Sequence, residues 1–334
     1  PTNHGFDTFV GIPYSNDMWP MHPEAKKGTY PPLPYYNDDK IVYSQPDQGQ
    51  FTKDFTNLTI DFIKEHKNEP FFVYVPHPMV HVPLHVSKEW DGATGLGLYA
   101  DVVAEIDDGV GRIIDTVNEL GIEEHTLIIF TSDNGPWLSY GNHGGQTDIY
   151  REGKGTTFEG GVRVPFVAWW PGTIRADSTS SEPLMTIDIL PTIAEWLEVP
   201  LPKHTIDGKS AVSIFEGQAD ATSPQEAYYF YYHKNNLEAI RWGKWKLHFP
   251  HGYRSMGDRP VGSDGTPGKY DYSVKTGLEL YNLETDPSET MNVSESFPKV
   301  MEKFALLASK IRNDLGDSLT DTKQTNQRMA GKVE

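Results

Sequence analysis

Cysteine is absent from the 334 residues, which excludes disulfides, thiolate metal ligands and a cysteine nucleophile within them. No apolar run approaches the roughly 20 residues that a membrane-spanning helix needs. Basic residues are few, because 29 Lys and Arg stand against 47 Asp and Glu and give a formal net charge of -18. Such a charge repels nucleic acid and anionic membrane surfaces. We therefore expect neither of them as a partner.

The apolar residues that are present, 37% of the chain, are enough for one large core and one smaller core. Up to residue 222, helical periodicity alternates with short, continuously apolar segments. This pattern predicts an α/β domain over residues 1–222, with a mostly parallel sheet flanked by helices. Residues 223–334 instead carry short strand-like segments and one final helix, which predicts a smaller α+β subdomain with an antiparallel sheet.

The expected elements follow from periodicity and from turn residues. The first 50 residues show no sustained period, and we expect an irregular surface segment there. In the large domain we expect helices at 51–63, 98–120 and 187–197 and buried strands at 71–76, 126–131 and 164–169. In the subdomain we expect strands at 227–232, 237–243, 244–249 and 278–283, a long loop at 250–276 and a helix at 300–311.

Asp133 and Asn134 end the apolar segment "LIIFTSDNG". In a parallel α/β sheet, ligands gather beyond the carboxyl ends of the strands. A carboxylate and an amide oxygen are hard ligands that suit Ca²⁺ or Mg²⁺. The alternative is that these residues form an Asp-Asn-Gly turn with no role in metal binding. Two ligands do not fill a coordination sphere, so a metal site would need others.

Three histidines, His77, His81 and His85, follow the expected strand at 71–76 in "HPMVHVPLH". Pro78 and Pro83 argue for an extended loop instead of a helix. A three-histidine zinc site is one interpretation. Contact of one histidine with an anionic substrate is the interpretation we favour, with solvated loop positions as the alternative for His77 and His85.

Lys154 lies between glycines in "REGKGTTFEGG", where backbone and a cation can approach an anion closely. The spacing is not that of a Walker A loop. A lysine exposed to solvent is the plain alternative. Between Asn134 and Lys154 lie Trp137, Tyr140, His143 and Arg151, which would line a leaving-group subsite or else an ordinary exposed loop.

The order of the segments is more specific than any one of them. "GFDTFVGIPYSND", "HPMVHVPL", "LIIFTSDNG", "GKGTTFEGGVRVP", "TIDILPTIAEWL" and "ELYNLETDPSETMNV" follow one another along the chain. Together they resemble the formylglycine-dependent sulfatases of the alkaline-phosphatase-like superfamily, in the branch of arylsulfatase A and N-acetylgalactosamine-6-sulfatase. The resemblance implies that Asp133 and Asn134 are the second pair of calcium ligands and that His81 binds the sulfate group. It also implies that Lys154 contacts both sulfate and formylglycine and that Ser15 lines the sulfate site.

By this resemblance the protein is a sulfuric ester hydrolase acting on a sulfated small molecule or saccharide, in a periplasmic, secreted or lysosomal setting. The family's formylglycine derives from a Cys/Ser-x-Pro-x-Arg motif, and no such motif occurs in these residues. Ser44 has a proline at the right offset, but Gln48 stands where the arginine belongs. We expect the nucleophile and the first Asp-Asp pair in a missing N-terminal segment or another chain. We accordingly expect weak or absent binding of one Ca²⁺, and no activity of this chain alone.

Two other functions remain open. A phosphatase or phosphodiesterase of the same superfamily would use two transition metals, and Asn134, in place of a metal-binding histidine, argues against it. A non-catalytic remnant that binds a sulfated ligand is the second alternative. The presence of Lys154, His81 and Asp133 argues mildly against it.

Overall fold

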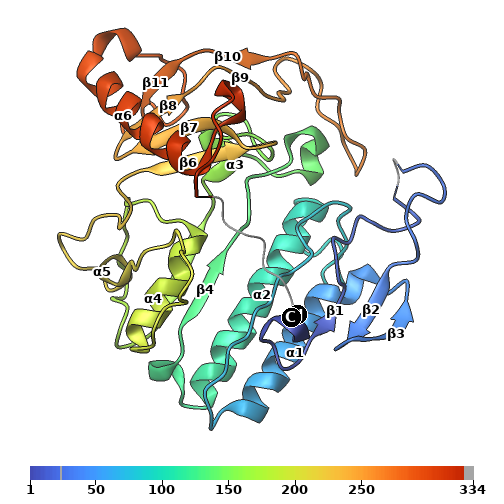
Figure 1. The fold of residues 1–334 in the computed structure, drawn as a ribbon. Coiled ribbons are helices and arrows are strands. Elements are labelled where there is room, and N and C mark those ends of the chain that lie inside the picture. Colours follow the sequence, from blue (N-terminus) through green and yellow to red (C-terminus); the bar gives the residue numbers. More distant parts are fainter. Residues whose placement is uncertain (23–24, 327–334) are drawn as a thin grey trace.

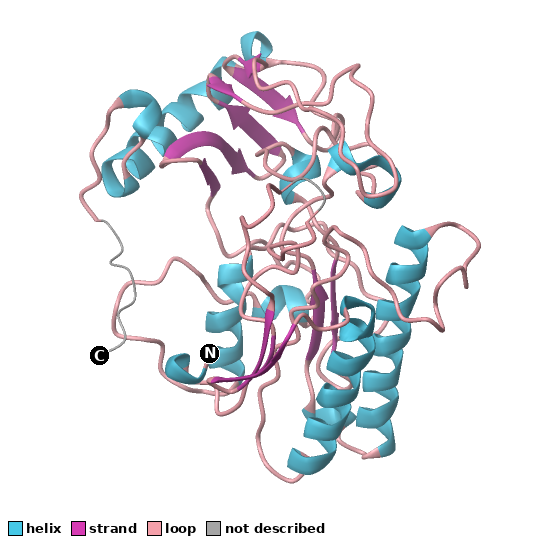
Figure 2. Cartoon of the chain, turned by 90° about the vertical axis from the view of Figure 1, so that its right-hand side faces the viewer, coloured by secondary structure: helices cyan, strands magenta, loops and turns pink. Residues whose placement is uncertain are grey.

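The protein is seen here as a computed structural model that describes residues 1–22 and 25–326 (Figure 1). Two lobes lie one above the other in this view. The long helices and the first strands make up the lower lobe, and a sheet covered by the last helix forms the upper lobe. Figure 2 shows the same division from the side.

The two long helices of the lower lobe, α1 (Phe51–His66) and α2 (Leu98–Glu119), pack side by side. They approach closely because Gly109 has no side chain, and a Cβ there would lie 2.6 Å from Thr56 Oγ1. Both helices were predicted from periodicity, and both predictions are confirmed. α2 ends just before Gly121, whose positive φ of 67° suits a helix stop.

The predicted strands before and after the glycine-rich loop are β4 (Ile128–Thr131) and β5 (Phe166–Trp169). They pair with each other in antiparallel register, so the expectation of parallel pairing is wrong for them. A continuous apolar run indicates burial but does not fix strand direction. Burial is also incomplete, because the cross-strand partners Phe130 and Val167 are 41% and 60% exposed.

Two further expectations for the lower lobe are wrong. Residues 71–76 are not a strand, and Phe72 and Tyr74 are exposed. Apolar, β-prone residues favour an extended backbone, but a strand also needs a hydrogen-bonded neighbour, and none lies beside this segment among the described residues. Conversely, the segment expected to be irregular contains an antiparallel sheet of β1 (Val10–Gly11), β2 (Pro34–Asn37) and β3 (Lys40–Ser44).

The upper lobe has the four-stranded antiparallel sheet and final helix that the sequence predicted. Its strand order is β11 (Glu279–Asn282), β8 (Trp245–His248), β7 (Asn236–Trp242) and β6 (Tyr228–Tyr232). Helix α6 (Pro298–Leu315) buries Phe304, Leu307 and Ile311 against the sheet. The expected long loop contains the short pair β9 (His251–Gly252) and β10 (Lys275–Thr276).

Shorter helices connect these parts. The α-helices are α3 (Glu159–Val162), α4 (Ile189–Trp196) and α5 (Val212–Phe215). The 3₁₀ helices are η1 (Thr2–His4), η2 (Gln48–Gln50), η3 (Glu123–His125), η4 (Leu138–His143), η5 (Thr186–Asp188), η6 (Ser294–Ser296) and η7 (Ser318–Thr320). No helix in the described ranges is long and apolar enough to cross a membrane.

Candidate functional site

Asp133 and Asn134 lie in the turn directly after β4, at the carboxyl end of that strand. The Ser132 hydroxyl donates to the Asn134 carbonyl at 3.1 Å, and the Gly135 amide donates to the Gly161 carbonyl at 3.0 Å. Gly135 permits this contact, because a Cβ there would lie 1.8 Å from the Gly160 carbonyl oxygen. The turn is therefore held against α3, with the Asp133 side chain exposed.

Lys154 approaches the same region from the glycine-rich loop. Its amide donates to the Pro136 carbonyl at 2.9 Å, and its Nζ lies 4.9 Å from the centroid of the Trp137 ring. Burial lowers the pKa of this ammonium, the Asp133 carboxylate opposes that effect, and the Arg254 guanidinium lowers the pKa further. Lys154 is thus a half-buried cation within electrostatic reach of the turn after β4.

His81 also contacts Trp137, with the two ring centroids 5.6 Å apart. Its Nδ1 is 2.7 Å from the Val82 carbonyl oxygen. A carbonyl only accepts, so Nδ1 carries the hydrogen, which leaves Nε2 as the free ring atom. Burial lowers the pKa of His81, and Lys154 lowers it further, while Asp17 and Asp133 raise it. His81, Lys154 and Asp133 therefore lie within electrostatic reach of one another, and their roles in a common site stay a prediction.

Asp17 is a residue of this region that the sequence reasoning did not select. Its negative charge raises the pKa of both His81 and Lys154. The preceding Asn16 is buried and holds the segment in place, since its amide donates to Gln48 Oε1 at 3.0 Å and to the Pro83 carbonyl at 3.3 Å. The signal that could have identified Asp17 was its position two residues after Ser15, in a segment that the sequence analysis had already selected.

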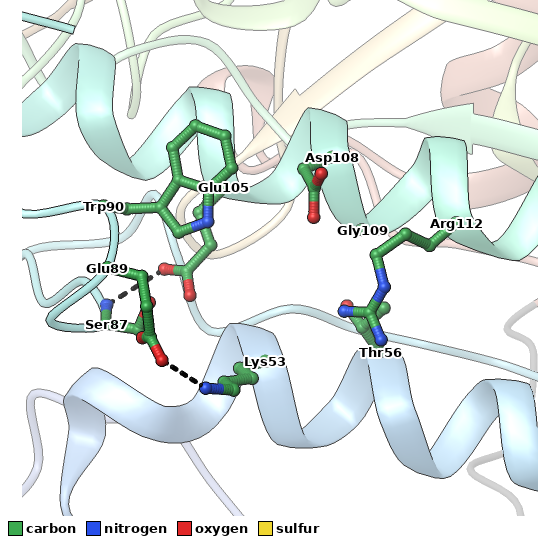
Figure 3. A pocket seen from close by; sticks show the side chains of 9 residues that line it. All are labelled: Lys53, Thr56, Ser87, Glu89, Trp90, Glu105, Asp108, Gly109 and Arg112. Carbon is green, nitrogen blue, oxygen red and sulfur yellow. Dashed lines mark hydrogen bonds and ion pairs between the residues drawn. The ribbon is translucent and has the colours of Figure 1, made fainter. Parts of the chain in front are cut away.

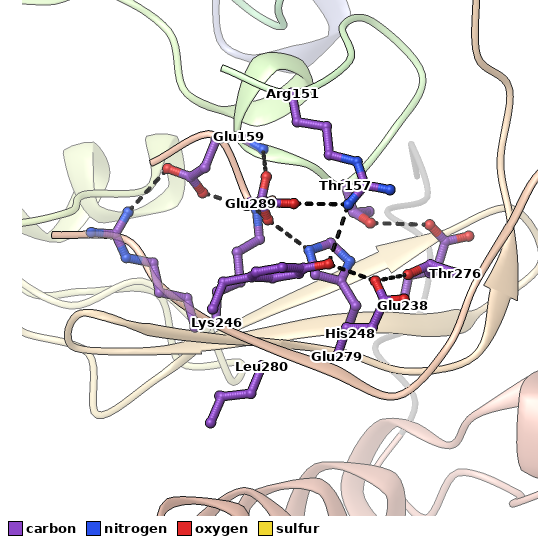
Figure 4. A network of polar contacts seen from close by, with 12 residues as sticks. Arg151, Thr157, Glu159, Glu238, Lys246, His248, Thr276, Glu279, Leu280 and Glu289 are labelled. Carbon is purple, nitrogen blue, oxygen red and sulfur yellow. Dashed lines mark hydrogen bonds and ion pairs between the residues drawn. The ribbon is translucent and has the colours of Figure 1, made fainter. Parts of the chain in front are cut away.

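Three other candidates have different surroundings. Ser15 is exposed, and its carbonyl accepts from the Met18 amide. His143, in η4, is half-buried with no hydrogen-bond partner at Nδ1. Arg151 lies in a polar network between the lobes (Figure 4), where it donates to the Tyr253 and Tyr281 hydroxyls and to a backbone carbonyl. These bonds engage both terminal nitrogens of Arg151, and its role in substrate binding stays a prediction.

The remaining histidines of the 77–85 segment do not join His81 in a cluster. His77 and His85 each have one buried ring nitrogen without a partner, and burial lowers the pKa of both. The His85 ring lies edge-on to Trp19 at 5.7 Å. Within residues 1–22 and 25–326, no three His, Cys, Asp or Glu side chains are arranged to hold a metal ion. Asp133 and Asn134 thus supply suitable oxygen donors but not a complete metal site.

A separate cavity of about 230 Å³ lies between α1, α2 and residues 87–90 (Figure 3). Lys53 pairs with Glu89 across it at 2.6 Å, and the Ser87 amide donates to Glu105 Oε2 at 3.1 Å. None of the predicted site residues lines it. We therefore place the candidate functional site at the Trp137 region and not at this cavity.

Comparison with known proteins identifies the family. A family model named Sulfatase matches residues 1–199, and a model for the C-terminal region of aryl-sulfatase matches residues 223–332. The chain belongs to the sulfatase family. A third model, for the C-terminal part of N-sulphoglucosamine sulphohydrolase, matches residues 152–247.

Several curated relatives of this sulfatase chain are similar over most of its length. Arylsulfatase from Hemicentrotus pulcherrimus is 38% identical over 75% of the chain. Arylsulfatase A from Homo sapiens is 31% identical over 92%, and N-acetylgalactosamine-6-sulfatase from Mus musculus is 33% identical over 88%. The matches span 45%, 64% and 59% of these relatives, respectively. The chain therefore covers less than two thirds of their length.

Solved structures show the same fold. A Bacteroides thetaiotaomicron protein from work on the metabolism of multiple glycosaminoglycans aligns with a TM-score of 0.68 and 28% identity, over 91% of this chain and 66% of its own. A sulfatase from Pseudoalteromonas sp. aligns with a TM-score of 0.79 and 23% identity, over 96% and 68%. Ps i-CgsB, solved with k-i-k-neocarrahexaose, has a TM-score of 0.71 and 23% identity, over 97% and 68%. The alkaline-phosphatase-like α/β class predicted from the sequence is confirmed.

Proposed function

We propose that this chain forms the sulfate-binding part of a sulfuric ester hydrolase, with Lys154 and His81 contacting the sulfate group. The observation that supports the proposal is their arrangement around one aromatic ring. Lys154 Nζ lies 4.9 Å from the Trp137 centroid and the His81 ring lies 5.6 Å from it, next to the turn that carries Asp133. An ammonium and an imidazole that face the same anion can both form charge-assisted hydrogen bonds to its oxygens.

Lys154 and His81 would act by preorganised electrostatics. The Lys154 charge is partly desolvated, so it stabilises charge on sulfuryl oxygens more strongly than a fully solvated lysine does. His81 presents Nε2, because Nδ1 is committed to the Val82 carbonyl. Since its pKa is lowered, the free imidazole is neutral at neutral pH, and it must gain a proton before Nε2 can donate to an anion. Sulfate binding should therefore take up a proton.

We propose Asp133 and Asn134 as part of a calcium site and Ser15 and His143 as further substrate contacts. The oxygen donors suit Ca²⁺, but other ligands must complete the sphere, so affinity in this chain should be weak. When present, the ion would offset negative charge on the sulfate group. Formylglycine, when present, would supply the nucleophile that attacks sulfur. No motif for it occurs in these 334 residues, so we propose that the chain alone does not turn over substrate.

We further propose that the catalytic domain covers residues 1–222 and the C-terminal subdomain residues 223–334. The substrate class that we propose is a sulfated small molecule or saccharide. Its support is the family membership, the relatives named as arylsulfatases and as N-acetylgalactosamine-6-sulfatases, and the complex of the similar Ps i-CgsB with k-i-k-neocarrahexaose.

Inorganic sulfate binding tests the proposed site without requiring turnover. Titration calorimetry should show that Lys154→Met and His81→Ala weaken sulfate binding about tenfold or more, which is the loss of one charge-assisted contact worth ~1.4 kcal/mol. The exposed Lys88 supplies the control, and Lys88→Met should bind sulfate like the parent chain. Parent binding should be tighter at pH 5.5 than at pH 7.5. Equal affinity of all variants would refute the site.

Turnover and metal content separate the alternatives. Hydrolysis of 4-nitrophenyl sulfate with Ca²⁺ should be absent for a sample whose intact mass matches the 334 residues. Robust hydrolysis by that species would show that the nucleophile lies within the chain. Metal analysis distinguishes the enzyme classes, because two bound zinc ions would favour the phosphatase alternative and one calcium ion the sulfatase.

A further inference from the structure

Arg254, in the C-terminal part of the chain, reaches the glycine-rich loop that carries Lys154. Its Nε donates to the Lys154 carbonyl oxygen at 2.9 Å, and its Nη2 donates to the same oxygen. Gly155 leaves the room for this contact, since a Cβ at that position would lie 2.5 Å from Arg254 Nη2. Two bonds from one planar guanidinium fix both the position and the orientation of the carbonyl.

The Arg254 guanidinium also contacts two aromatic rings. It lies 5.7 Å from the centroid of Trp137, the ring shared by Lys154 and His81, and 4.7 Å from that of Tyr270. Tyr270 is itself fastened to η4, because its hydroxyl accepts from the Ser139 amide at 3.3 Å. Arg254 thus fixes the backbone of Lys154 and also contacts the ring beneath the Lys154 side chain.

The loop that follows Arg254 is bound to η4, which follows Trp137 in the chain. The amides of Gly262 and Gly268 donate to the Ser139 carbonyl at 2.8 and 2.7 Å. Asn142 and Asp264 exchange a side-chain bond and a backbone bond, each 2.9 Å long. Arg254 is therefore held on a docked loop, not on a free one.

The charge of Arg254 is not neutralised locally. In the part of the chain that the structure describes, it has no ion pair, whereas Arg259 of the same loop pairs with Asp271 at 3.0 Å. The charged groups that face Lys154 are Asp133, Asp17 and Arg254, and the titratable His81 also faces it. Two neighbouring cations destabilise each other unless an anion binds between them or beside them.

We propose that Arg254 is a positioning residue of the sulfate site, which fixes the Lys154 backbone and the Trp137 ring so that the Lys154 ammonium faces the anion. This inference rests on the proposed function. It assigns the upper lobe a direct part in organising the site. Arg254 acts through Lys154, and so its loss should change the ionisation of Lys154 as well as sulfate affinity.

The ionisation of Lys154 can be measured by NMR on the chain with ¹³C-methylated lysines, the resonance being assigned from its absence in Lys154→Arg. Arg254→Met removes a neighbouring cation, so the pKa of Lys154 should rise by about half a unit or more. Sulfate should bind about tenfold more weakly. Arg254→Lys keeps the positive charge but not the pair of hydrogen bonds to the Lys154 carbonyl oxygen. This variant should therefore restore the pKa of Lys154 more fully than the sulfate affinity. Arg259→Met is the matched control and should change neither quantity.

Arg254→Met with the parent pKa of Lys154 and the parent sulfate affinity would overturn the proposal. If that variant does not fold, Arg254→Gln is titrated against the same criteria. If the parent chain binds no sulfate, the proposed function fails, and Arg254 is judged by the ionisation of Lys154 alone. The charge-conserving Arg254→Lys then decides: a Lys154 resonance that shifts in this variant supports the positioning role, and a resonance at the parent position refutes it.

Discussion

Glu238 is a buried carboxylate beside a histidine, and its proton should govern part of the pH dependence of stability. It is 1% exposed, its Oε2 accepts from the Thr157 hydroxyl at 3.2 Å and its Oε1 has no partner. His251 Nε2 lies 3.4 Å from Oε2, while His251 Nδ1 donates to the Phe249 carbonyl. Burial lowers the pKa of His251 and raises that of Glu238 to about 7. Glu238 is therefore held in its neutral form by burial, close to a histidine that burial also holds neutral.

Glu238→Gln should flatten the stability profile. The folded pKa of about 7 exceeds the ordinary value of 4.5, so the contribution is fully present below about pH 4.5 and is lost as pH rises through 7. The variant should match the parent chain near pH 5 and exceed its free energy of unfolding by up to ~3 kcal/mol at pH 8. Denaturant unfolding across this pH range measures the difference.

The control is Glu284→Gln, which changes a carboxylate that is 66% exposed. Its profile should run parallel to that of the parent chain. A Glu238→Gln profile that is also parallel would show that Glu238 is ionised throughout.

Sequence reasoning at the residue scale selects candidates where a local motif carries the chemistry. Lys154, His81 and Asp133 each stand in a short, characteristic segment, and the structure brings them together. Arg254 could not be found in this way, because it lies 100 positions from Lys154 and no local pattern marks it. Only the docking of one lobe on the other creates that contact.

The turn after β4 depends on a close approach between two backbone segments. Gly135→Ala would place a Cβ 1.8 Å from the Gly160 carbonyl oxygen, and neither backbone segment can move without disturbing α3 or the Asp133–Asn134 turn. We expect a loss of about 2 kcal/mol or more in the free energy of unfolding. Calcium affinity, if measurable in the parent chain, should fall as well.

Gly111 is a glycine at which alanine should stabilise the protein, in contrast to Gly135. It is exposed on α2, and a Cβ there would meet nothing within 4 Å. Gly111→Ala should therefore gain about 0.5–1 kcal/mol, because alanine favours the helix. Equal stability of Gly135→Ala and the parent chain would mean that the turn is not packed as the structure shows.

At the scale of elements, periodicity predicted α1, α2, α4 and α6, because each helix shows its apolar face within its own sequence. Strand pairing was predicted less well. The direction of β4 and β5 and the unpaired state of residues 71–76 depend on which segments become neighbours. The sheet of β1 to β3 was missed because its strands are short and separated by turn-rich sequence.

Buried charges join α3, which belongs to the proposed domain 1–222, to the upper sheet, so the whole molecule should unfold as one unit. Lys246 Nζ, from the upper sheet, lies 2.9 Å from Glu159 Oε1 of α3 and 3.1 Å from Glu289 Oε1 (Figure 4). His248 Nε2 is 2.7 Å from the same Glu289 oxygen. Burial alone would raise the pKa of Glu289, but Lys246 and His248 more than offset this and hold it at about 2.

Lys246→Met should be strongly destabilising, because it removes the buried cation that two buried carboxylates share and leaves Glu159 only its longer pairs with Arg241 and Arg163, at 3.6 and 3.8 Å. The expected cost is about 3–5 kcal/mol. The neighbouring Lys244, whose partner Glu284 is exposed, is the matched control, and Lys244→Met should cost less than about 1 kcal/mol. Both values come from denaturant unfolding followed by tryptophan fluorescence and by circular dichroism.

The stability difference between Lys246→Met and the parent chain should also depend on pH, which a loss of packing alone would not cause. In the parent chain the folded pKa of Glu289 is below the ordinary 4.5, so its contribution is present above pH 4.5 and is lost as pH falls toward 2. Without Lys246 that pKa rises, and the gap between variant and parent should narrow from pH 7 to pH 4. A constant gap would show that Lys246 acts through packing, and two separate transitions in the parent chain would show that the lobes unfold independently.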